Sequence, residues 1–191
     1  MKRTFKLAYI ISLFLCYLSS LFASELKITK ISTENNSYNI VLNNAITINN
    51  IALKNKNDIK IIEFPVYVGK GKIYEQFSVL NREYSLHMAS SIFENKIYDF
   101  KGETSFKINK FSPVKKDGNI KAFASVIFED VLEVECRVMK GKRGLWVAWP
   151  ANKTPEGWKA DFIFVDKELK KRVENDLIRR YHKENERQQN K

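Results

Sequence analysis

The stretch that decides the fold is Gly144-Leu145-Trp146-Val147-Ala148-Trp149-Pro150, followed after two residues by Lys153-Thr154-Pro155-Glu156-Gly157. The first segment is a short apolar run between a Gly and a Pro, which predicts a strand from Leu145 to Trp149 that ends at Pro150. Thr154–Gly157 predicts a turn, because Pro presets the backbone and Gly tolerates a positive φ. The segment therefore indicates short antiparallel strands.

The sequence on either side of this stretch extends the sheet and adds one helix. Alternating or β-branched apolar runs predict strands over residues 106–111, 120–128, 131–139 and 159–165. Asp166 is a candidate N-cap, and Leu169, Val173, Leu177 and Tyr181 recur every four residues as one apolar stripe. We expect the polar tail from His182 to Lys191 to fray or to be disordered.

The same order of elements occurs earlier in the chain. Leu26–Ser32 matches Phe106–Ser112 at an offset of 80 residues, and Gln76–Glu83 matches Asp161–Glu168 at an offset of 85. The increase in this offset from 80 to 85 predicts about five extra residues in the second copy, between its second strand and the Trp-Pro strand. The first copy predicts a helix from Arg82 to about Phe93 that has lost nearly all the positive charge.

We therefore predict an α+β fold of two tandem small antiparallel β-sheet domains, each followed by one C-terminal helix, which could form an intramolecular pseudo-dimer. In chain order, the predicted domains are a leader at residues 1–23, a degenerate first domain with its linker at 24–105, a second domain at 106–183 and a polar tail at 184–191.

Three motifs of the second copy occur in a fixed order. They are the strand end Arg137-Val138-Met139-Lys140-Gly141, the strand Gly144–Pro150 and the turn Lys153–Gly157. In this order and spacing they resemble the stage V sporulation protein G family (SpoVG, septation protein). The resemblance covers residues 106–183, and the first copy carries Val68-Gly69-Lys70-Gly71-Lys72 in place of the last motif.

The resemblance implies a small antiparallel sheet with one C-terminal helix and self-association through that fold. Family members are bacterial proteins linked to cell division at the septum and to sporulation control, and several bind DNA or RNA. Two copies in one chain would replace two subunits by an intramolecular pseudo-dimer.

Charge divides the chain in the same way. The formal net charge is +11; residues 24–105 carry ten bases and nine acids, whereas residues 106–191 carry 20 bases and 13 acids. A basic domain attracts polyanions such as nucleic acid, anionic lipid or acidic glycan. A solvated lysine-rich surface explains the same charge equally well.

The bases of the C-terminal helix are the first candidates for phosphate contact, because such contacts need long cationic side chains along one exposed face. The alternative is a solvated helix face, interrupted by Glu174 and Asp176. Bases in the turns near the Trp-Pro strand could extend the site. The predicted nucleic-acid-binding residues are Lys170, Lys171, Arg172, Arg179, Arg180, Lys183, Arg143 and Lys153.

The N-terminus has the layout of a secretory signal. Three bases precede the apolar run Leu7–Phe22, and small residues follow at Ala23 and Ser24. We expect export to the periplasm or cell envelope after cleavage near Ala23, or alternatively an inner-membrane anchor through residues 7–23. Because SpoVG proteins typically lack a leader, an envelope module that contacts a protein, lipid or glycan is the alternative function.

No catalytic or metal-ligand pattern is found, and we expect no enzyme activity, cofactor, metal or small-molecule substrate. Cys136 lies in an alternating apolar run, which favours a core position. Trp146 and Trp149 should face opposite sides of their strand, so that at least one of them packs in the core; Trp158 follows in the next strand region.

Overall fold

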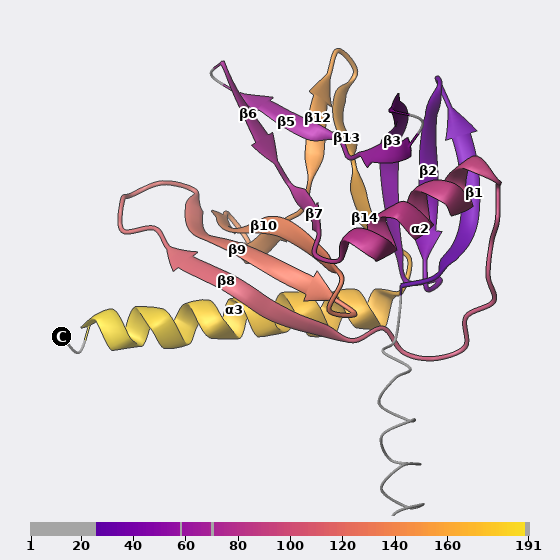
Figure 1. Cartoon of the computed structure of the whole chain (residues 1–191). Helices are drawn as coiled ribbons and strands as arrows, with labels where there is room; N and C mark the ends of the chain where they lie inside the picture. Colours follow the sequence, from indigo (N-terminus) through magenta and orange to yellow (C-terminus); the bar gives the residue numbers. More distant parts are fainter. Residues whose placement is uncertain (1–25, 58, 70, 190–191) are drawn as a thin grey trace, which may run out of the picture.

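The structure is a computed structural model that describes residues 26–189 except residues 58 and 70. The predicted leader lies outside the described residues. Both halves of the described chain contain seven strands and one helix in the same order (Figure 1). The first half comprises β1 (Ile28–Glu34), β2 (Ser37–Leu42), β3 (Ile46–Lys56), β4 (Ile59–Glu63), β5 (Val66–Gly69), β6 (Lys72–Glu75), β7 (Phe77–Val79) and α2 (Arg82–Phe93).

The second half repeats this series with longer elements. It comprises β8 (Phe106–Pro113), β9 (Ile120–Phe128), β10 (Leu132–Gly141), β11 (Gly144–Ala148), β12 (Ala151–Thr154), β13 (Gly157–Ala160), β14 (Phe162–Phe164) and α3 (Lys167–Gln189). The predicted α+β fold, with two antiparallel sheets each followed by a helix, is confirmed.

The last strand of each half pairs with the sheet of the other half. β14 pairs with β3, with Phe162 opposite Ile48, and β7 pairs with β10, with Val79 opposite Leu132. One sheet has the order β1-β2-β3-β14 with β4 beside β3, and the other has the order β11-β10-β9-β8 with β7 beside β10. The two halves therefore interlock by a reciprocal exchange of strands.

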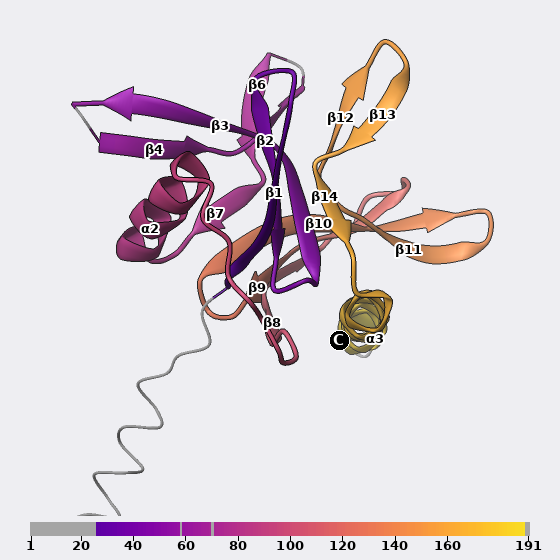
Figure 2. The ribbon, with the colours of Figure 1, turned by 90° about the vertical axis from the view of Figure 1, so that its right-hand side faces the viewer.

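An interruption of the β-strand at Asp161 makes this exchange possible. The sequence predicted one strand over residues 159–165, but the structure divides it into β13 and β14. The backbone N–H groups of Asp161 and Phe162 both donate to the carbonyl oxygen of Pro150, at 3.0 and 3.2 Å. β13 can then stay in a hairpin with β12 while β14 crosses to β3 (Figure 2).

The extra residues of the second half are in its first hairpin, not between its second strand and the Trp-Pro strand as predicted. Asn35 and Asn36 alone connect β1 to β2, whereas residues 114–119 connect β8 to β9. Asn35 and Asn36 have φ of 49° and 62°, the left-handed conformation that two-residue hairpin turns need and that Asn tolerates. From β4 and β11 onward, the predicted offset of 85 matches the two series.

One continuous apolar core joins the two halves. It includes Ile46 and Ile48 of β3, Val134 of β10, Phe162 of β14 and the helix residue Leu177. Trp149 packs against it and stacks on Phe162, with 5.0 Å between ring centroids, as predicted for one of the tryptophans. Cys136 is buried in this core, also as predicted.

Helix α3 is longer than the sequence predicted. Asp166 caps it, accepting from the backbone N–H groups of Glu168 and Leu169 at 2.8 and 3.0 Å. It continues to Gln189, through the region expected to fray, and an Arg187–Glu184 ion pair of 3.4 Å lies in that last part. No helix within residues 26–189 is long and apolar enough to cross a membrane.

Candidate nucleic-acid interface

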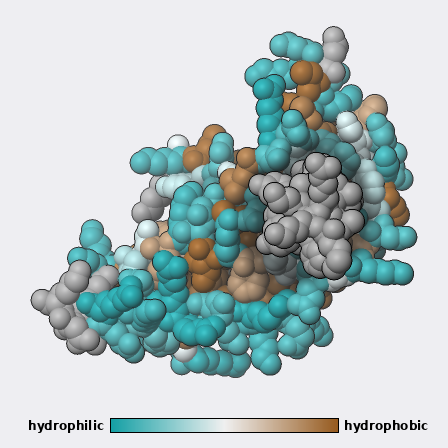
Figure 3. Space-filling view, turned by 60° about the horizontal axis from the view of Figure 1, so that its bottom comes forward, coloured by the Kyte–Doolittle hydropathy of each residue, from teal (hydrophilic) through white to brown (hydrophobic). Residues whose placement is uncertain are grey.

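The apolar stripe of α3 determines which side of the helix remains free for a ligand. Leu169, Val173 and Leu177 are fully buried, and the helix lies along β8, β9, β10 and β11. Burial of each of these side chains contributes about 1.5–3 kcal/mol, so the stripe fixes the helix against the sheet. The opposite side faces solvent, and the surface on this side of the molecule is mostly hydrophilic (Figure 3).

Helix α3 is basic. Between Lys167 and Arg187 it has eight bases and five acids, a net charge of +3. The equivalent helix α2 has one base, Arg82, and one acid, Glu83. The two helices occupy equivalent places in the interlocked fold, yet only α3 is basic. Any polyanion contact made by this element therefore belongs to the second half.

Four of the six predicted helix bases have a partner. Lys170 lies 3.9 Å from Glu174, Arg172 lies 3.1 Å from Glu103 and Arg179 pairs with Asp176. The Arg180 guanidinium lies over the ring of Phe111, 5.8 Å from its centroid. All four side chains remain exposed; the carboxylates offset part of the charge of the first three bases, whereas the neutral ring of Phe111 leaves the charge of Arg180 unchanged.

Lys171 and Lys183 are the remaining two. Both are exposed, and neither makes an ion pair with any residue in the described part of the chain. Among the six predicted helix bases, these two lysines are therefore the ones that a phosphate could bind without displacing a carboxylate.

The structure does not bring the two turn bases to α3. Arg143 is at the exposed tip of the β10–β11 hairpin, which projects sideways from the sheet (Figure 2). Lys153 is on β12, in the hairpin at the end of the molecule farthest from α3 (Figure 1). The eight predicted residues thus form one group of six along α3 and two separate positions.

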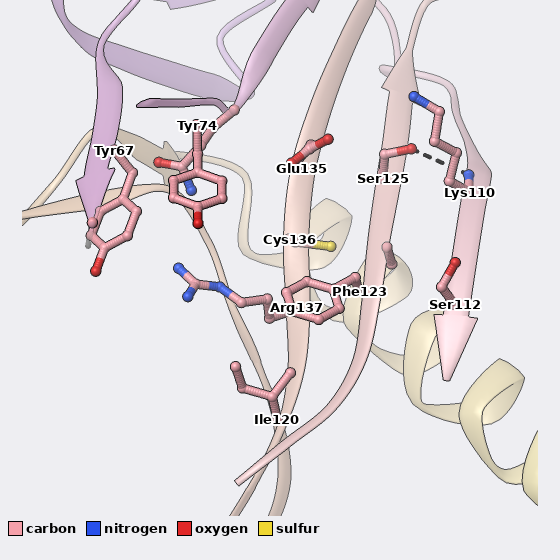
Figure 4. A pocket seen from close by; sticks show the side chains of 13 residues that line it. Tyr67, Tyr74, Lys110, Ser112, Ile120, Phe123, Ser125, Glu135, Cys136 and Arg137 are labelled. Atoms are coloured by element: carbon pink, nitrogen blue, oxygen red, sulfur yellow. Dashed lines mark hydrogen bonds between the residues drawn. The ribbon is translucent and has the colours of Figure 1, made fainter. Parts of the chain in front are cut away.

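A cavity that the sequence did not reveal lies between the β5–β6 hairpin of the first half and the open face of the second sheet. Its volume is ≈ 490 Å³, and its lining includes Tyr67, Tyr74, Gln76, Phe123, Glu135 and Arg137. Figure 4 shows the two tyrosines on one side and Arg137 and Phe123 on the other. One sequence signal was available: Tyr67 and Tyr74 are each separated by one residue from the Gly-Lys-Gly-Lys segment, residues 69–72, that stands in place of the second copy's Thr-Pro turn.

The polar residues beside this cavity are held by a buried carboxylate. Glu133 accepts from Ser125 Oγ at 2.6 Å and Asn109 Nδ2 at 2.9 Å, and Lys110 Nζ lies 3.2 Å away. Burial acts to raise the pKa of Glu133, but these three partners together hold that pKa below its ordinary value. The carboxylate thus fixes the irregular segment of β8 between Ile108 and Phe111.

Comparison with known proteins gives one consistent result. Residues 104–183 match the SpoVG family. A protein of Acholeplasma laidlawii named as a septation protein SpoVG is 33% identical over 70 residues, 36% of this chain and 74% of that protein. A protein of the same name from Clostridium perfringens is 32% identical over 82 residues, 42% of this chain and 88% of that protein.

Proposed function

This chain belongs to the SpoVG family, and from that membership we propose that it is a non-enzymatic septation-type regulator that binds DNA or RNA through the basic residues of α3. The observation that carries the proposal is the fixed, outward-facing position of six bases along one helix, with Lys171 and Lys183 unpaired within residues 26–189. Phosphate contacts of this kind give affinity with little sequence specificity.

The interlocked fold supports a helix that works as a rigid element. Its buried stripe packs on a sheet that is completed by β7 of the first half. The degenerate first half would then serve to complete the second half's fold, while the second half carries the contacts. Both halves are needed for one binding surface.

The test is fluorescence anisotropy of the full-length chain with a labelled duplex DNA and a single-stranded RNA at several salt concentrations. The logarithm of the binding constant should fall linearly with the logarithm of salt concentration, by about 0.9 per phosphate contact on duplex DNA. Substitution of Lys171 and Lys183 by Ala should lower that slope by about two and weaken binding to all sequences alike.

A matched control removes the same charge elsewhere. Lys30→Ala with Lys56→Ala takes two exposed lysines from the first sheet and should leave the slope nearly unchanged. Equal effects of both pairs would mean that only the net charge matters and that α3 is not the interface.

A second function is favoured by the leader-like residues 1–23, namely an envelope-located interaction module. Fractionation of cells and determination of the mature N-terminus separate the two. A chain that begins near Ser24 in the periplasm would rule out a chromosomal role, and a full-length cytosolic chain would rule out the envelope role.

A further inference from the structure

We infer that the cavity between the β5–β6 hairpin and the open face of the second sheet binds an uncharged oligosaccharide. The site is separate from α3, which packs on the other face of the same sheet. Sugar binding in the cavity is therefore independent of nucleic-acid binding by the helix.

Aromatic side chains line the cavity on both sides. Tyr67 and Tyr74 are paired across the hairpin with 6.0 Å between ring centroids, and Phe123 faces them from β9 (Figure 4). Tyr74 is 45% exposed and Phe123 is 50% exposed. Exposed rings around a concavity are characteristic of ligand sites, and their faces suit the apolar C–H face of a pyranose ring.

The polar groups of the cavity suit hydroxyl groups. Gln76 is only 8% exposed, and its Oε1 has no hydrogen-bond partner in the described part of the chain. A buried amide oxygen without a donor costs stability, so a ligand that donates to it gains affinity. Glu135 accepts, the Arg137 guanidinium donates, and a sugar hydroxyl can satisfy either.

The charge of the cavity disfavours a polyanion. Glu135 and Arg137 lie two residues apart on the same face of β10, and Lys110 is already paired with Glu133 at 3.2 Å. A phosphate chain placed here would lie beside the exposed carboxylate of Glu135. A neutral ligand with an apolar face and many hydroxyl groups meets no such repulsion.

The equivalent position in the other half has polar contacts in place of the aromatic rings. There, Asn152 and Lys159 occupy the places of Tyr67 and Tyr74, and Lys159 Nζ lies 3.3 Å from Glu34 of β1. Asp161 occupies the place of Gln76 and accepts from Asn50 and Asn152, each at 2.7 Å. The polar groups at this position therefore have partners within the chain, whereas Gln76 Oε1 at the equivalent place in the cavity has none within the described residues.

The experiment is isothermal titration calorimetry of the full-length chain with chitotetraose and with cellotetraose. We expect at least one of them to bind, and Tyr74→Ala or Phe123→Ala to weaken that binding by about tenfold, because each change removes a stacking face. Both side chains are half-exposed, so the variants should keep the circular dichroism spectrum of the parent chain. Gln76→Leu tests the amide separately and should weaken binding by a similar factor.

Trp158→Ala is the matched control, because Trp158 is an exposed aromatic residue on the other hairpin, β12–β13, and should leave sugar binding unchanged. If neither sugar binds at a concentration on the order of 10 mM, the inference is overturned. A single-stranded oligonucleotide that binds in a Tyr74-dependent manner while the sugars do not would overturn it as well and would assign the cavity to nucleic acid.

Discussion

Asn50 of the first half donates to Asp161 of the second half, with 2.7 Å between Asn50 Nδ2 and Asp161 Oδ1. The Asp161 carbonyl also accepts from the backbone N–H of Asn49, at 2.9 Å. The side chain of Asp161 is 1% exposed, and its other oxygen accepts from Asn152. This contact fixes the point at which the chain leaves one sheet to join the other.

Substitution of Asn50 by Gly tests the contact. Asn50 has a φ of 61°, which Gly adopts freely, so the change removes the donor without straining the backbone. The loss should lower the free energy of unfolding by about 1–3 kcal/mol, because a buried carboxylate loses a hydrogen bond. Urea denaturation measures it. Asn57→Gly is the control: its φ is 52° and its side chain is exposed, so its effect should be within about 0.5 kcal/mol.

Glu133 should make the free energy of unfolding fall as the pH is lowered into the acid range. Burial opposes its ionisation, but Ser125, Asn109 and Lys110 hold its pKa below the ordinary value. A carboxyl group with a lowered pKa in the folded state contributes stability above its unfolded pKa of about 4.3, and this contribution is lost as the pH falls through the folded pKa. Ser125→Ala should reduce this contribution, so the variant should lose less stability than the parent between neutral and acid pH.

Thermal unfolding across that range measures the difference, with Ser32→Ala on the exposed side of β1 as control. Identical pH profiles for Ser125→Ala and the parent would contradict the assignment.

The Cys136 thiol should be unreactive in the folded protein. Burial, with smaller contributions from Glu135 and Glu174, raises its pKa to about 12, so almost no thiolate is present at neutral pH. In a Cys16→Ser background, iodoacetamide at pH 8 should label Cys136 only at the rate at which the chain unfolds. Mass spectrometry of the tryptic peptides measures the rate, and addition of denaturant should speed it greatly. Rapid labelling of the native chain would show that the thiol is accessible.

A fragment of residues 104–191 should not be a stable monomer. It lacks β7, the strand that pairs with Leu132–Val134 of β10, and its own β14 has no β3 to pair with. In a dimer of the fragment, β14 of each copy can pair with β10 of the other copy, just as β7 and β14 each pair with the other half of the full chain. Size-exclusion chromatography with light scattering should therefore give a dimer, while the full-length chain is expected to keep its exchange within one chain. A folded monomeric fragment would show that the exchanged strand is dispensable.

The sequence by itself determined most of the elements and their order, but it missed β12 and the division of residues 159–165 into β13 and β14. Apolar alternation, the Trp-Pro strand, the turn residues and the stripe Leu169–Tyr181 are local signals, and they identified both helices, the duplication and the SpoVG likeness. Four of the six bases of α3, Lys171, Arg172, Arg179 and Lys183, could be named for the same reason, since a helical period places them mostly opposite a recognisable apolar stripe.

Only the tertiary structure decided which strand completes which sheet. β7 and β14 have three residues each, too few to specify a partner by pattern, and the partner of each lies in the other half. That exchange brings the β5–β6 hairpin over the second sheet and so creates the cavity at Tyr67 and Arg137. It also separates Lys153 from α3, although the two are close in sequence, because β12 stays in its hairpin while the chain beyond Asp161 crosses the core.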